Sequence, residues 1–377
     1  MSQELCGRER LLLLLKNQPA DRIGFAPLID GYFLSGLKER KTDIQVLKEA
    51  GCEIISRHIP VYQINLAGFL PAPTRAGENS PIKMELSQEQ GSLCIRYYLG
   101  KYQLRQRIIF NQYSPFIPWV VEYLIKSPDD LKAFGEIYSQ LKFFPDEKIF
   151  QELERQIGDD GLASADVPTS PLQLLVNLYA GLETTVYLLA DAPEVYQEYH
   201  SQVHQKNLEL CRLLTESSAR VFISYENTSS STTGPRLFEK YELPCLNQYS
   251  QILKARGKIH LIHMCGKLWT MRDLLKRLTA EGFCDISPPP PGDTDPVLAK
   301  KFFPEKVIIG GIDPISLVEG NPEKLEELVK GIIFRLEGKS NGFILGSADA
   351  TPKGSTPQTL RLISGLVKKY SHHFSRG

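Results

Sequence analysis

Eight short apolar runs, each followed by a polar or amphipathic stretch, constrain the fold of this chain more than any other feature. The runs are short enough to be buried strands, whereas the stretches between them have helical spacing. Alternating strands and helices are typical of a parallel sheet, and eight such units predict a (β/α)8 TIM barrel of the α/β class. The predicted strands are 22–29, 52–58, 161–166, 220–226, 258–264, 283–287, 306–310 and 342–346.

Helical patterns connect these runs, and proline or an acidic residue begins several of them, as is usual for a first turn. We expect one barrel domain over residues 1–377. An antiparallel β meander is predicted within 80–125, inserted after strand two, because turn residues such as Gln90-Gly91 separate its β-rich runs. A cap over the barrel mouth and an inert decoration are both open as its role. The predicted helices are 171–189, 195–215, 268–281, 322–336 and 357–369, and the predicted meander strands are 82–86, 93–98 and 102–110.

Composition narrows the class of protein. The 44 basic and 44 acidic residues cancel, so nothing favours binding to nucleic acid or to an acidic membrane surface. No run approaches the ~18 apolar residues of a membrane span. The seven cysteines are scattered and contain no Cys-x-x-Cys pair, which is typical of free thiols in a reducing cytoplasm. We therefore expect a cytoplasmic enzyme.

The run His263-Met264-Cys265-Gly266 ends the fifth predicted strand. Residues two apart on a strand point to the same face, so an imidazole and a thiol lie side by side there. Zinc favours this pair of ligands. A buried His and Cys that merely pack together are the alternative. His260 faces the other way and is expected to be a packing residue.

Barrel enzymes carry their catalytic groups where strands end and the following loops begin. Chemically capable residues stand at or just after all eight predicted ends: Asp30, Tyr32 and Phe33; His58; Asp166; Tyr225, Glu226 and Asn227; His263 and Cys265; Asp285 and Ser287; Asp313; and Asp349.

Several of these residues also have a purely structural explanation. Asp313 precedes Pro314 and is expected to be a helix N-cap, and Asp30 can be one too. Asp166 can support the start of the helix at Pro171 as well as act in catalysis. His58 fits a structural histidine and a ligand equally well. Glu226 follows a buried strand, so a functional role is favoured for it.

Familiar nucleotide and hydrolase motifs are missing. The chain has no G-x-x-x-x-G-K-[ST] loop, no G-x-G-x-x-G after a strand and no G-x-S-x-G elbow. Gly310-Gly311 after the seventh strand is weak evidence for anion binding. Metal-assisted chemistry is therefore favoured over nucleotide or hydride chemistry.

Over residues 8–370 the chain resembles the uroporphyrinogen decarboxylase superfamily, and within it the corrinoid-dependent methyltransferase branch. The resemblance depends on a set of short motifs rather than on any one of them. They are Val-Glu-Tyr-Leu-Ile-Lys-Ser-Pro-Asp-Asp-Leu at 121–131, Gly-Pro-Arg-Leu-Phe at 234–238 with Leu243-Pro244, His-x-Cys-Gly at 263–266, Gly-Gly-Ile-Asp-Pro at 310–314, and Thr356-Pro357.

The resemblance implies a barrel with a zinc ion held by the His and Cys of His-x-Cys and by a second Cys after the last strand. His263 and Cys265 match this pattern, but Gly346-Ser347-Ala348-Asp349 carries no thiol. Either Asp349 supplies an oxygen ligand, or the third ligand comes from elsewhere, or zinc is lost. Relatives that cleave aryl methyl ethers use a Glu-x20-His pair instead, which Glu242 and His263 match. Their further upstream Glu would fall on Asn227, next to Glu226. The resemblance therefore implies one zinc held by His263 with Glu242, Cys265 or both.

The implied reaction moves a methyl group from a methyl ether, a methoxylated aromatic compound, to the cobalt(I) corrinoid of a partner protein. Zinc would stabilise the charge that develops on the ether oxygen, and carboxylate ligands make zinc a harder Lewis acid than thiolates do. Glu226 and Asp166 are the expected catalytic carboxylates. The expected substrate contacts are Asp30, Tyr32, Phe33, His58, Tyr62, Tyr225 and Asn227, although the aromatic residues can equally be packing.

Three alternatives stay open. A uroporphyrinogen decarboxylase needs several convergent arginines for its polycarboxylate substrate, and only Arg22 and Arg57 lie near the relevant strand ends. A methylcobalamin:thiol methyltransferase shares the fold and His-x-Cys but favours a thiolate-rich zinc site. A non-enzymatic barrel could dock a corrinoid-binding protein. The expected partners are that protein and a small methylated substrate, with a homo-oligomer left open.

Overall fold

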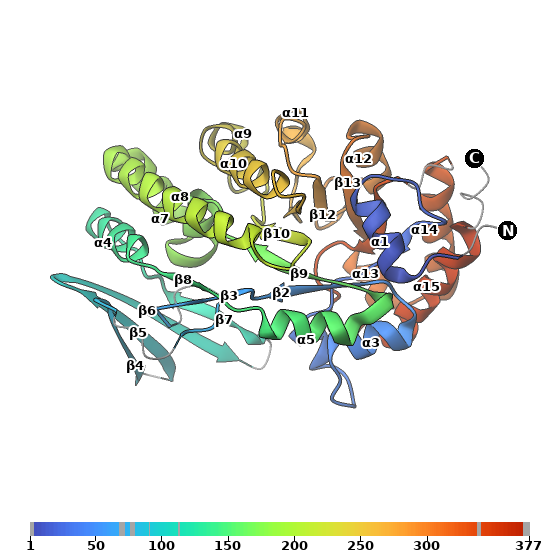
Figure 1. Cartoon of the computed structure of the whole chain (residues 1–377), viewed down its shortest axis with the longest axis horizontal. Helices are drawn as coiled ribbons and strands as arrows, with labels where there is room; N and C mark the ends of the chain where they lie inside the picture. The colour runs from blue at the N-terminus through green and yellow to red at the C-terminus, as the bar shows by residue number, and fades with distance from the viewer. Residues whose placement is uncertain are drawn as a thin grey trace.

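Eight parallel strands form one curled sheet in the computed structural model, which describes residues 4–67, 72–75, 80–89, 91–111, 114–337 and 341–371. The strand order is β1-β14-β13-β12-β11-β10-β9-β2, so neighbours in space are mostly neighbours in sequence (Figure 1). The strands are β1 (Gly24–Phe25), β2 (Ile54–Ile59), β9 (Gly161–Val167), β10 (Val221–Tyr225), β11 (Ile259–His263), β12 (Gly282–Ile286), β13 (Val307–Ile312) and β14 (Phe343–Ser347).

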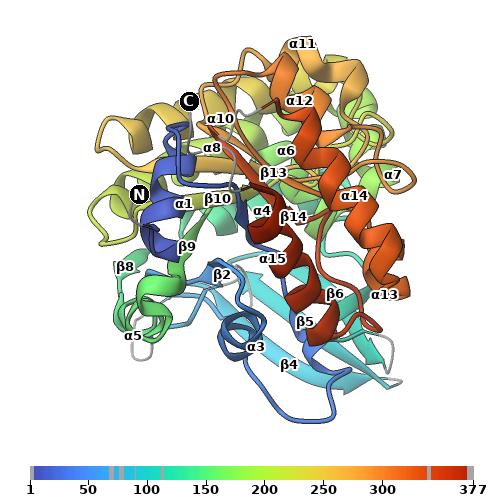
Figure 2. The ribbon, with the colours of Figure 1, turned by 90° about the vertical axis from the view of Figure 1, so that its right-hand side faces the viewer.

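The predicted α/β barrel is confirmed, and each predicted strand overlaps one of these eight. The strands are largely buried on both faces because helices cover the outside of the sheet, which explains why apolar residues predominate in them. Figures 1 and 2 show the helices of the chain, most of which lie around the sheet. They are α1 (Gly7–Leu15), α2 (Gly31–Leu34), α3 (Asp43–Ala50), α4 (Pro128–Ser139), α5 (Lys148–Ile157), α6 (Pro171–Leu174), α7 (Gly181–Asp191), α8 (Pro193–Thr215), α9 (Pro235–Leu237), α10 (Leu243–Lys254), α11 (Arg272–Leu275), α12 (Pro296–Phe302), α13 (Pro314–Glu319), α14 (Pro322–Arg335) and α15 (Pro357–Ser371).

Two predicted helices differ from the structure. The pattern over 171–189 is divided among α6, a π-helical turn and α7, because Gly181 adopts a left-handed conformation with φ of 74°. The pattern over 268–281 gives only a short 3-10 turn and α11. The chain leaves the helix there because Asn247 of α10 accepts a hydrogen bond from the Thr279 N–H and donates one to the Arg277 carbonyl.

The seam between β1 and β2, the two ends of the sheet, is closed by Glu53. Its backbone N–H donates to the Phe25 carbonyl at 3.0 Å, and its carboxylate accepts from the Phe25 N–H at 2.7 Å. The same carboxylate binds Arg10 at 2.7 Å and Arg22 at 2.6 Å, and all three charged side chains are buried. A buried carboxylate with two cationic partners is tolerated where an unpaired one would not be.

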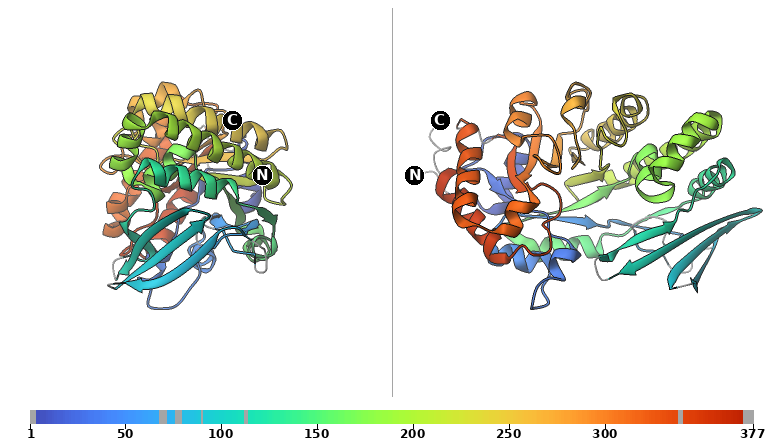
Figure 3. Two further views of the ribbon diagram at one scale, coloured as in Figure 1. Left: turned by 90° about the vertical axis from the view of Figure 1, so that its left-hand side faces the viewer. Right: turned by 180° about the vertical axis from the view of Figure 1, so that it is seen from behind.

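The predicted meander is present after β2 and is longer than expected. It comprises β4 (Lys83–Glu89), β5 (Ser92–Leu99), β6 (Tyr102–Asn111) and a fourth strand, β7 (Ser114–Glu122), all antiparallel. Gln90 of the predicted first turn lies outside the described residues, whereas Gly91 has a φ of 73°. Figure 3 shows the meander extending away from the ring of helices, beside α4. A further pair of short strands, β3 (Tyr62–Ile64) and β8 (Phe143–Pro145), was not predicted.

Among the described residues, no helix is long and apolar enough to cross a membrane.

Replacing Glu53 by alanine tests whether the seam depends on its carboxylate. Glu53→Ala leaves Arg10 and Arg22 buried without that partner, so we expect a loss of about 3–5 kcal/mol in the free energy of unfolding. Urea unfolding followed by circular dichroism measures this loss. The control is Glu337→Ala, which removes an exposed ion pair with Lys301 and should change stability by about 1 kcal/mol or less. Equal effects of the two substitutions would show that the seam does not need Glu53.

Candidate functional site

A cavity of about 910 Å3 opens at the carboxyl ends of the barrel strands. This is the end at which barrel enzymes carry their active sites. Seven of the residues predicted from the sequence line it: Asp30, Tyr32, His58, Tyr225, Asn227, His263 and Asp349. None of the described residues of the meander strands β4–β7 is among the residues that line it. Its role as a cap therefore stays a prediction.

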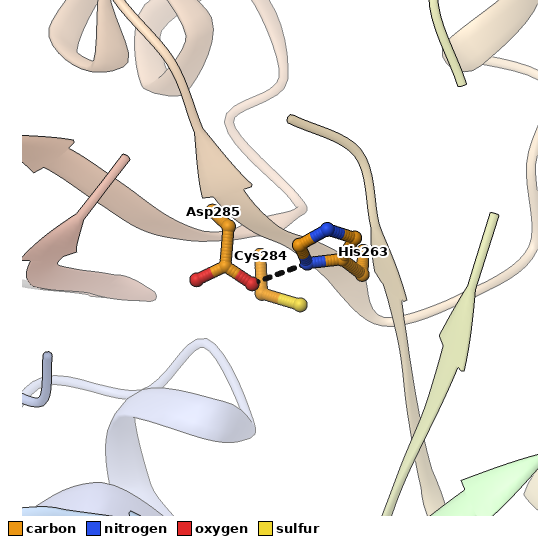
Figure 4. A group of neighbouring side chains, drawn as sticks. All are labelled: His263, Cys284 and Asp285. Carbon is orange, nitrogen blue, oxygen red and sulfur yellow. Dashed lines mark hydrogen bonds and ion pairs between the residues drawn. The ribbon is translucent and has the colours of Figure 1, made fainter. Parts of the chain in front are cut away.

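His263 is held in a fixed orientation by a buried carboxylate. Its Nδ1 lies 2.6 Å from Oδ2 of Asp285, and Figure 4 shows the carboxylate directed at the ring. Arg57 of β2 donates to the same Asp285 oxygen. Burial alone would raise the pKa of Asp285, but the Arg57 charge and the hydrogen bond from His263 hold it well below its usual range. A carboxylate only accepts hydrogen bonds, so Nδ1 of His263 carries the hydrogen and Nε2 is left free to act as a ligand.

Three potential ligand atoms converge beside that free nitrogen. Each of His263, Cys265 and Asp349 offers one ligand atom, and these three atoms lie within 4.8 Å of one another. Nε2 of His263 is 3.8 Å from Oδ1 of Asp349, and the Cys265 sulfur is 3.9 Å from the Asn227 side-chain oxygen. Imidazole, thiolate and carboxylate are all accepted ligands of zinc, and three protein ligands are usual at catalytic zinc sites. An outer carboxylate on the second imidazole nitrogen, as Asp285 provides, is also typical of such sites.

A second group, His263 with Cys284 and Asp285, also has ligand-type atoms within 4.8 Å of one another (Figure 4). A cation fits poorly here because the Arg57 guanidinium already binds Asp285 and lies 4.0 Å from the Cys284 sulfur. Both carboxylate and thiol therefore already face a fixed positive charge. We interpret this group as the buried support of His263 rather than as a metal centre.

Backbone strain gathers around the same rim. His58, Asn227, Asp285 and Asp349 have φ values of 58°, 52°, 65° and 117°, although none is glycine. Residues other than glycine rarely adopt such backbone conformations, and each such residue costs of the order of 1 kcal/mol or more of folding free energy. All four stand at or near the carboxyl end of a barrel strand. Strain of this kind persists where surrounding contacts hold it, and it is frequent at functional sites.

His58 and Asp166 come together on neighbouring strands. Nδ1 of His58 is 3.2 Å from Oδ2 of Asp166, and the His58 ring stacks on Tyr225 with 4.0 Å between centroids. Beyond this pair lies a second cavity of about 210 Å3, which is also lined by Tyr62 and Leu178. His58, Tyr225, Leu178 and Asn227 line both cavities, so the two adjoin.

Glu226 and Glu242 lie elsewhere, in a fully buried cluster behind the rim. Glu226 accepts a hydrogen bond from the Ser170 hydroxyl at 2.5 Å, and Glu242 accepts one from Gln173 at 3.1 Å. Neither carboxylate lines either rim cavity or belongs to a potential metal group among the described residues. The spacing of Glu242 to His263 therefore does not bring those two residues into one metal group. Glu242 stands on a π-helical turn that directs it at Gln173 and Thr228.

The pKa values of these two carboxyls are raised. Burial raises the pKa of Glu226 to about 7, although hydrogen bonds from Ser170 oppose the shift. Burial, and then the charge of Glu226, raise the pKa of Glu242 to about 8. Neither carboxyl has a cationic partner among the described residues. Two interacting buried carboxyls avoid carrying two charges by retaining protons.

Four further residues named in the sequence analysis make structural contacts, and of these four only Asp30 also lines the large cavity. Asp30 and Asp313 are N-caps of α2 and α13, accepting hydrogen bonds from Phe33 and Ser316 N–H groups at 2.9 Å. The Phe33 side chain is buried and does not line the cavity. His260 bonds Ser250 and Ser224 inside the fold.

Gly310-Gly311 is required by packing, since a Cβ on Gly310 would come within 2.6 Å of the Ile286 backbone nitrogen. Close strand contact thus explains this pair without an anion.

Sequence reasoning missed the roles of Arg57 and Asp285. The sequence identifies Asp285 as a carboxylate at a strand end, and it identifies Arg57 only as an arginine near one. Their contacts with His263 join β2 to β11 and β12. Arg57 is far from Asp285 in the chain, so no short-range pattern signals that contact.

Comparisons with known proteins identify the family and a similar fold. The sequence model of the uroporphyrinogen decarboxylase (URO-D) family matches residues 118–370. No curated protein matches the chain by sequence. A methyltransferase from Methanosarcina mazei has a similar structure, with a TM-score of 0.60, 11% identity, and coverage of 97% of this chain and 99% of that one. A D-psicose 3-epimerase from Clostridium cellulolyticum H10 overlaps less, with a TM-score of 0.37, 8% identity, and coverage of 60% and 83%.

The buried carboxyl pair makes stability depend on pH. From the ordinary value of 4.5 to the raised values of about 7 and about 8, the folded chain holds protons that the unfolded chain has lost. The free energy of unfolding should therefore fall as pH rises through this window, by up to about 1.4 kcal/mol per pH unit for each carboxyl. Glu242→Gln keeps the shape of the protonated side chain, so we expect it to flatten this fall. Urea midpoints at pH 5.5, 6.5 and 7.5 measure the slope, with the exposed Glu337→Gln as control. An unchanged slope in Glu242→Gln would contradict the assignment.

Proposed function

The chain belongs to the uroporphyrinogen decarboxylase family, and we propose that it is a zinc-dependent methyltransferase of that family. In this proposal a methyl ether, a methoxylated aromatic compound, gives its methyl group to the cobalt(I) corrinoid of a partner protein. The observation that carries the proposal is the convergence of His263, Cys265 and Asp349 at the rim of the large cavity. The fold shared with the methyltransferase from Methanosarcina mazei supports it.

The residues at the rim suit zinc better than they suit the harder cations. Nitrogen and sulfur donors favour zinc over magnesium or calcium, which prefer oxygen ligands alone. Asp285 and Arg57 keep Nε2 of His263 available before any metal arrives. Zinc bound there supplies Lewis acidity to the oxygen from which the methyl group departs. Asp349 takes the place of the second thiolate that the resemblance leads one to expect, and a carboxylate leaves the metal a harder acid.

The two adjoining cavities suit a donor with an apolar body. The larger, at about 910 Å3, exceeds what one small methyl donor needs and leaves room for an acceptor to approach. The smaller, at about 210 Å3, has mainly apolar and aromatic walls that include Tyr62 and Leu178. An aromatic ring in the smaller cavity would have its methoxy group directed past Tyr225, whose ring centroid is 5.3 Å from that of His263. Burial of the ring and contact with Tyr62 and Tyr225 would hold it there.

Charge argues against the decarboxylase alternative. Arg57 is the one arginine among the described residues that line the large cavity, and Asp285 occupies it. Arg22 lies at the Glu53 seam instead. The same cavity is lined by Asp30, Asp43 and Asp349. A polycarboxylated tetrapyrrole would meet more negative than positive charge here, whereas an uncharged ether would not be repelled.

A thiol acceptor is the second candidate, because Cys265 and His263 are also the ligands expected of a methylcobalamin:thiol methyltransferase. The carboxylate at position 349 favours the ether. All seven cysteines are free thiols in the structure, which agrees with the reducing compartment that a cobalt(I) corrinoid requires. We therefore expect the protein to work in the cytoplasm.

Metal content tests the proposal directly. We expect about one zinc per chain in anaerobically purified protein, and its loss in His263→Ala. Cys265→Ala and Cys284→Ala form a matched pair, because the same substitution removes a thiol from one potential metal group or from the other. Under the proposal the first loses zinc and the second keeps it. Asp285→Ala should weaken zinc affinity by about 10–100-fold through loss of the outer carboxylate. Elemental analysis and competition with a chromogenic chelator measure these outcomes.

Two results would contradict the proposal. Zinc retained in Cys265→Ala but lost in Glu242→Gln would assign the metal to the buried carboxyls instead. No zinc in any preparation, even after reconstitution, would remove metal-assisted methyl transfer and favour a decarboxylase-like or docking protein.

A further inference from the structure

The backbone at the end of β2 turns His58 out of the barrel wall. The register between β2 and β9 shifts between Ser56 and Ile59, and His58 has a φ of 58° at that irregularity. In β2 it is the one exposed residue, with 58% of its side chain accessible. A bulge of this kind re-aims a side chain at a cost in backbone strain. The strained backbone at this position thus directs the His58 imidazole at the two cavities.

Contacts on two sides fix the imidazole. Tyr225 of β10 stacks on its face, with an angle of 28° between the rings. Asp166 of β9 lies 3.2 Å from Nδ1. Because the carboxylate accepts, Nδ1 carries the hydrogen, and Nε2 has no partner among the described residues. An imidazole oriented by a carboxylate on one nitrogen, with the other nitrogen free at a cavity, is the arrangement of a proton donor or acceptor.

Asp166 itself can accept more hydrogen bonds than the described residues supply. Its second oxygen, Oδ1, is buried with no hydrogen-bond partner among the described residues, and so is the hydroxyl of the adjacent Tyr225. The Arg57 guanidinium is bound to Asp285. His58 is therefore the one base that Asp166 contacts within the described part of the chain, and the two residues act as a unit.

We propose that His58, positioned by Asp166, is the general acid that protonates the oxygen from which the methyl group departs. This inference rests on the proposed function. The methyl carbon–oxygen bond breaks and its electron pair stays on oxygen. The electron pair of the cobalt(I) corrinoid forms the new bond to the methyl carbon. His58 acts in its imidazolium form, with one hydrogen on each ring nitrogen. The Nε2 proton moves to the oxygen, so that a neutral phenol leaves. The neutral imidazole keeps its hydrogen on Nδ1, facing Asp166, and Nε2 regains a proton from solvent through the open cavity.

His58→Gly tests the proton donor with little risk to folding, because glycine adopts a positive φ without steric cost. The full-length zinc-loaded protein is assayed with free cob(I)alamin as methyl acceptor. The donors are methoxybenzene and 4-nitromethoxybenzene, whose leaving 4-nitrophenolate needs a proton far less. We expect His58→Gly to lower the rate with methoxybenzene by about 100-fold or more and the rate with the nitro compound much less. Added imidazole should restore part of the methoxybenzene rate. The control is Glu337→Gly, which also replaces a residue of positive φ by glycine but lies outside both cavities.

A second measurement does not depend on activity. Long-range 1H–15N NMR of the neutral His58 ring, assigned by its loss in His58→Gly, should show the one remaining hydrogen on Nδ1 in the unmodified chain. In Asp166→Ala the hydrogen should move largely to Nε2. This change of tautomer is what a positioning role for Asp166 predicts and a merely structural role does not.

The outcomes distinguish a failure of the His58 and Asp166 roles from a failure of the proposed function. An equal loss of rate with both donors, without rescue by imidazole, would overturn the acid role of His58 and leave the proposed function standing. An unchanged tautomer in Asp166→Ala would overturn the role of Asp166. No methyl transfer by the unmodified zinc-loaded chain from either donor would overturn the proposed function and this inference with it.

Discussion

A sheet that curls until its two ends meet needs something at the seam, and here that contact depends on one buried carboxylate. Glu53 bonds the backbone of β1 on one side and two arginines on the other. Across the barrel from this seam, Arg57 of β2 binds Asp285 of β12, and Asp285 orients His263. One strand, β2, thus connects the ion cluster at its start with the imidazole at the rim.

The rim shows how one set of charges can satisfy two requirements. Arg57 neutralises Asp285 inside the barrel, where an unpaired carboxylate would be costly. The same carboxylate then selects the hydrogen position on His263. Because the positive charge is buried and used, the cavity presents carboxylates and aromatic rings rather than an anion site. The support of the metal group and the charge preference of the cavity thus have a common origin in Arg57.

Local patterns were sufficient for the strands but not for the site. Burial on both faces makes the strands predominantly apolar, and this pattern can be recognised in the sequence without knowing which strands are neighbours. His58 and Asp166 were each found as strand ends, yet their contact depends on the adjacency of β2 and β9 and on an irregular register. Asp349 was placed near His263 only as one of several options.

Glu242 illustrates the opposite case. Its spacing to His263 matched a known pattern, but a π-helical turn directs its side chain to Gln173. Spacing along a chain specifies position on an element only while the element keeps its regular geometry. The helix over 171–189 deviates for a similar reason, because Gly181 breaks its path.

The left-handed residues at the rim have a consequence for the evolution of the chain. His58, Asn227, Asp285 and Asp349 each adopt a conformation that glycine would adopt with less strain. A laboratory search for thermal stability alone would therefore tend to erase the rim, substituting glycine where the side chains carry chemistry. The same four positions, recognised by backbone conformation only, mark the region in which this barrel gives up stability at the carboxyl ends of its strands.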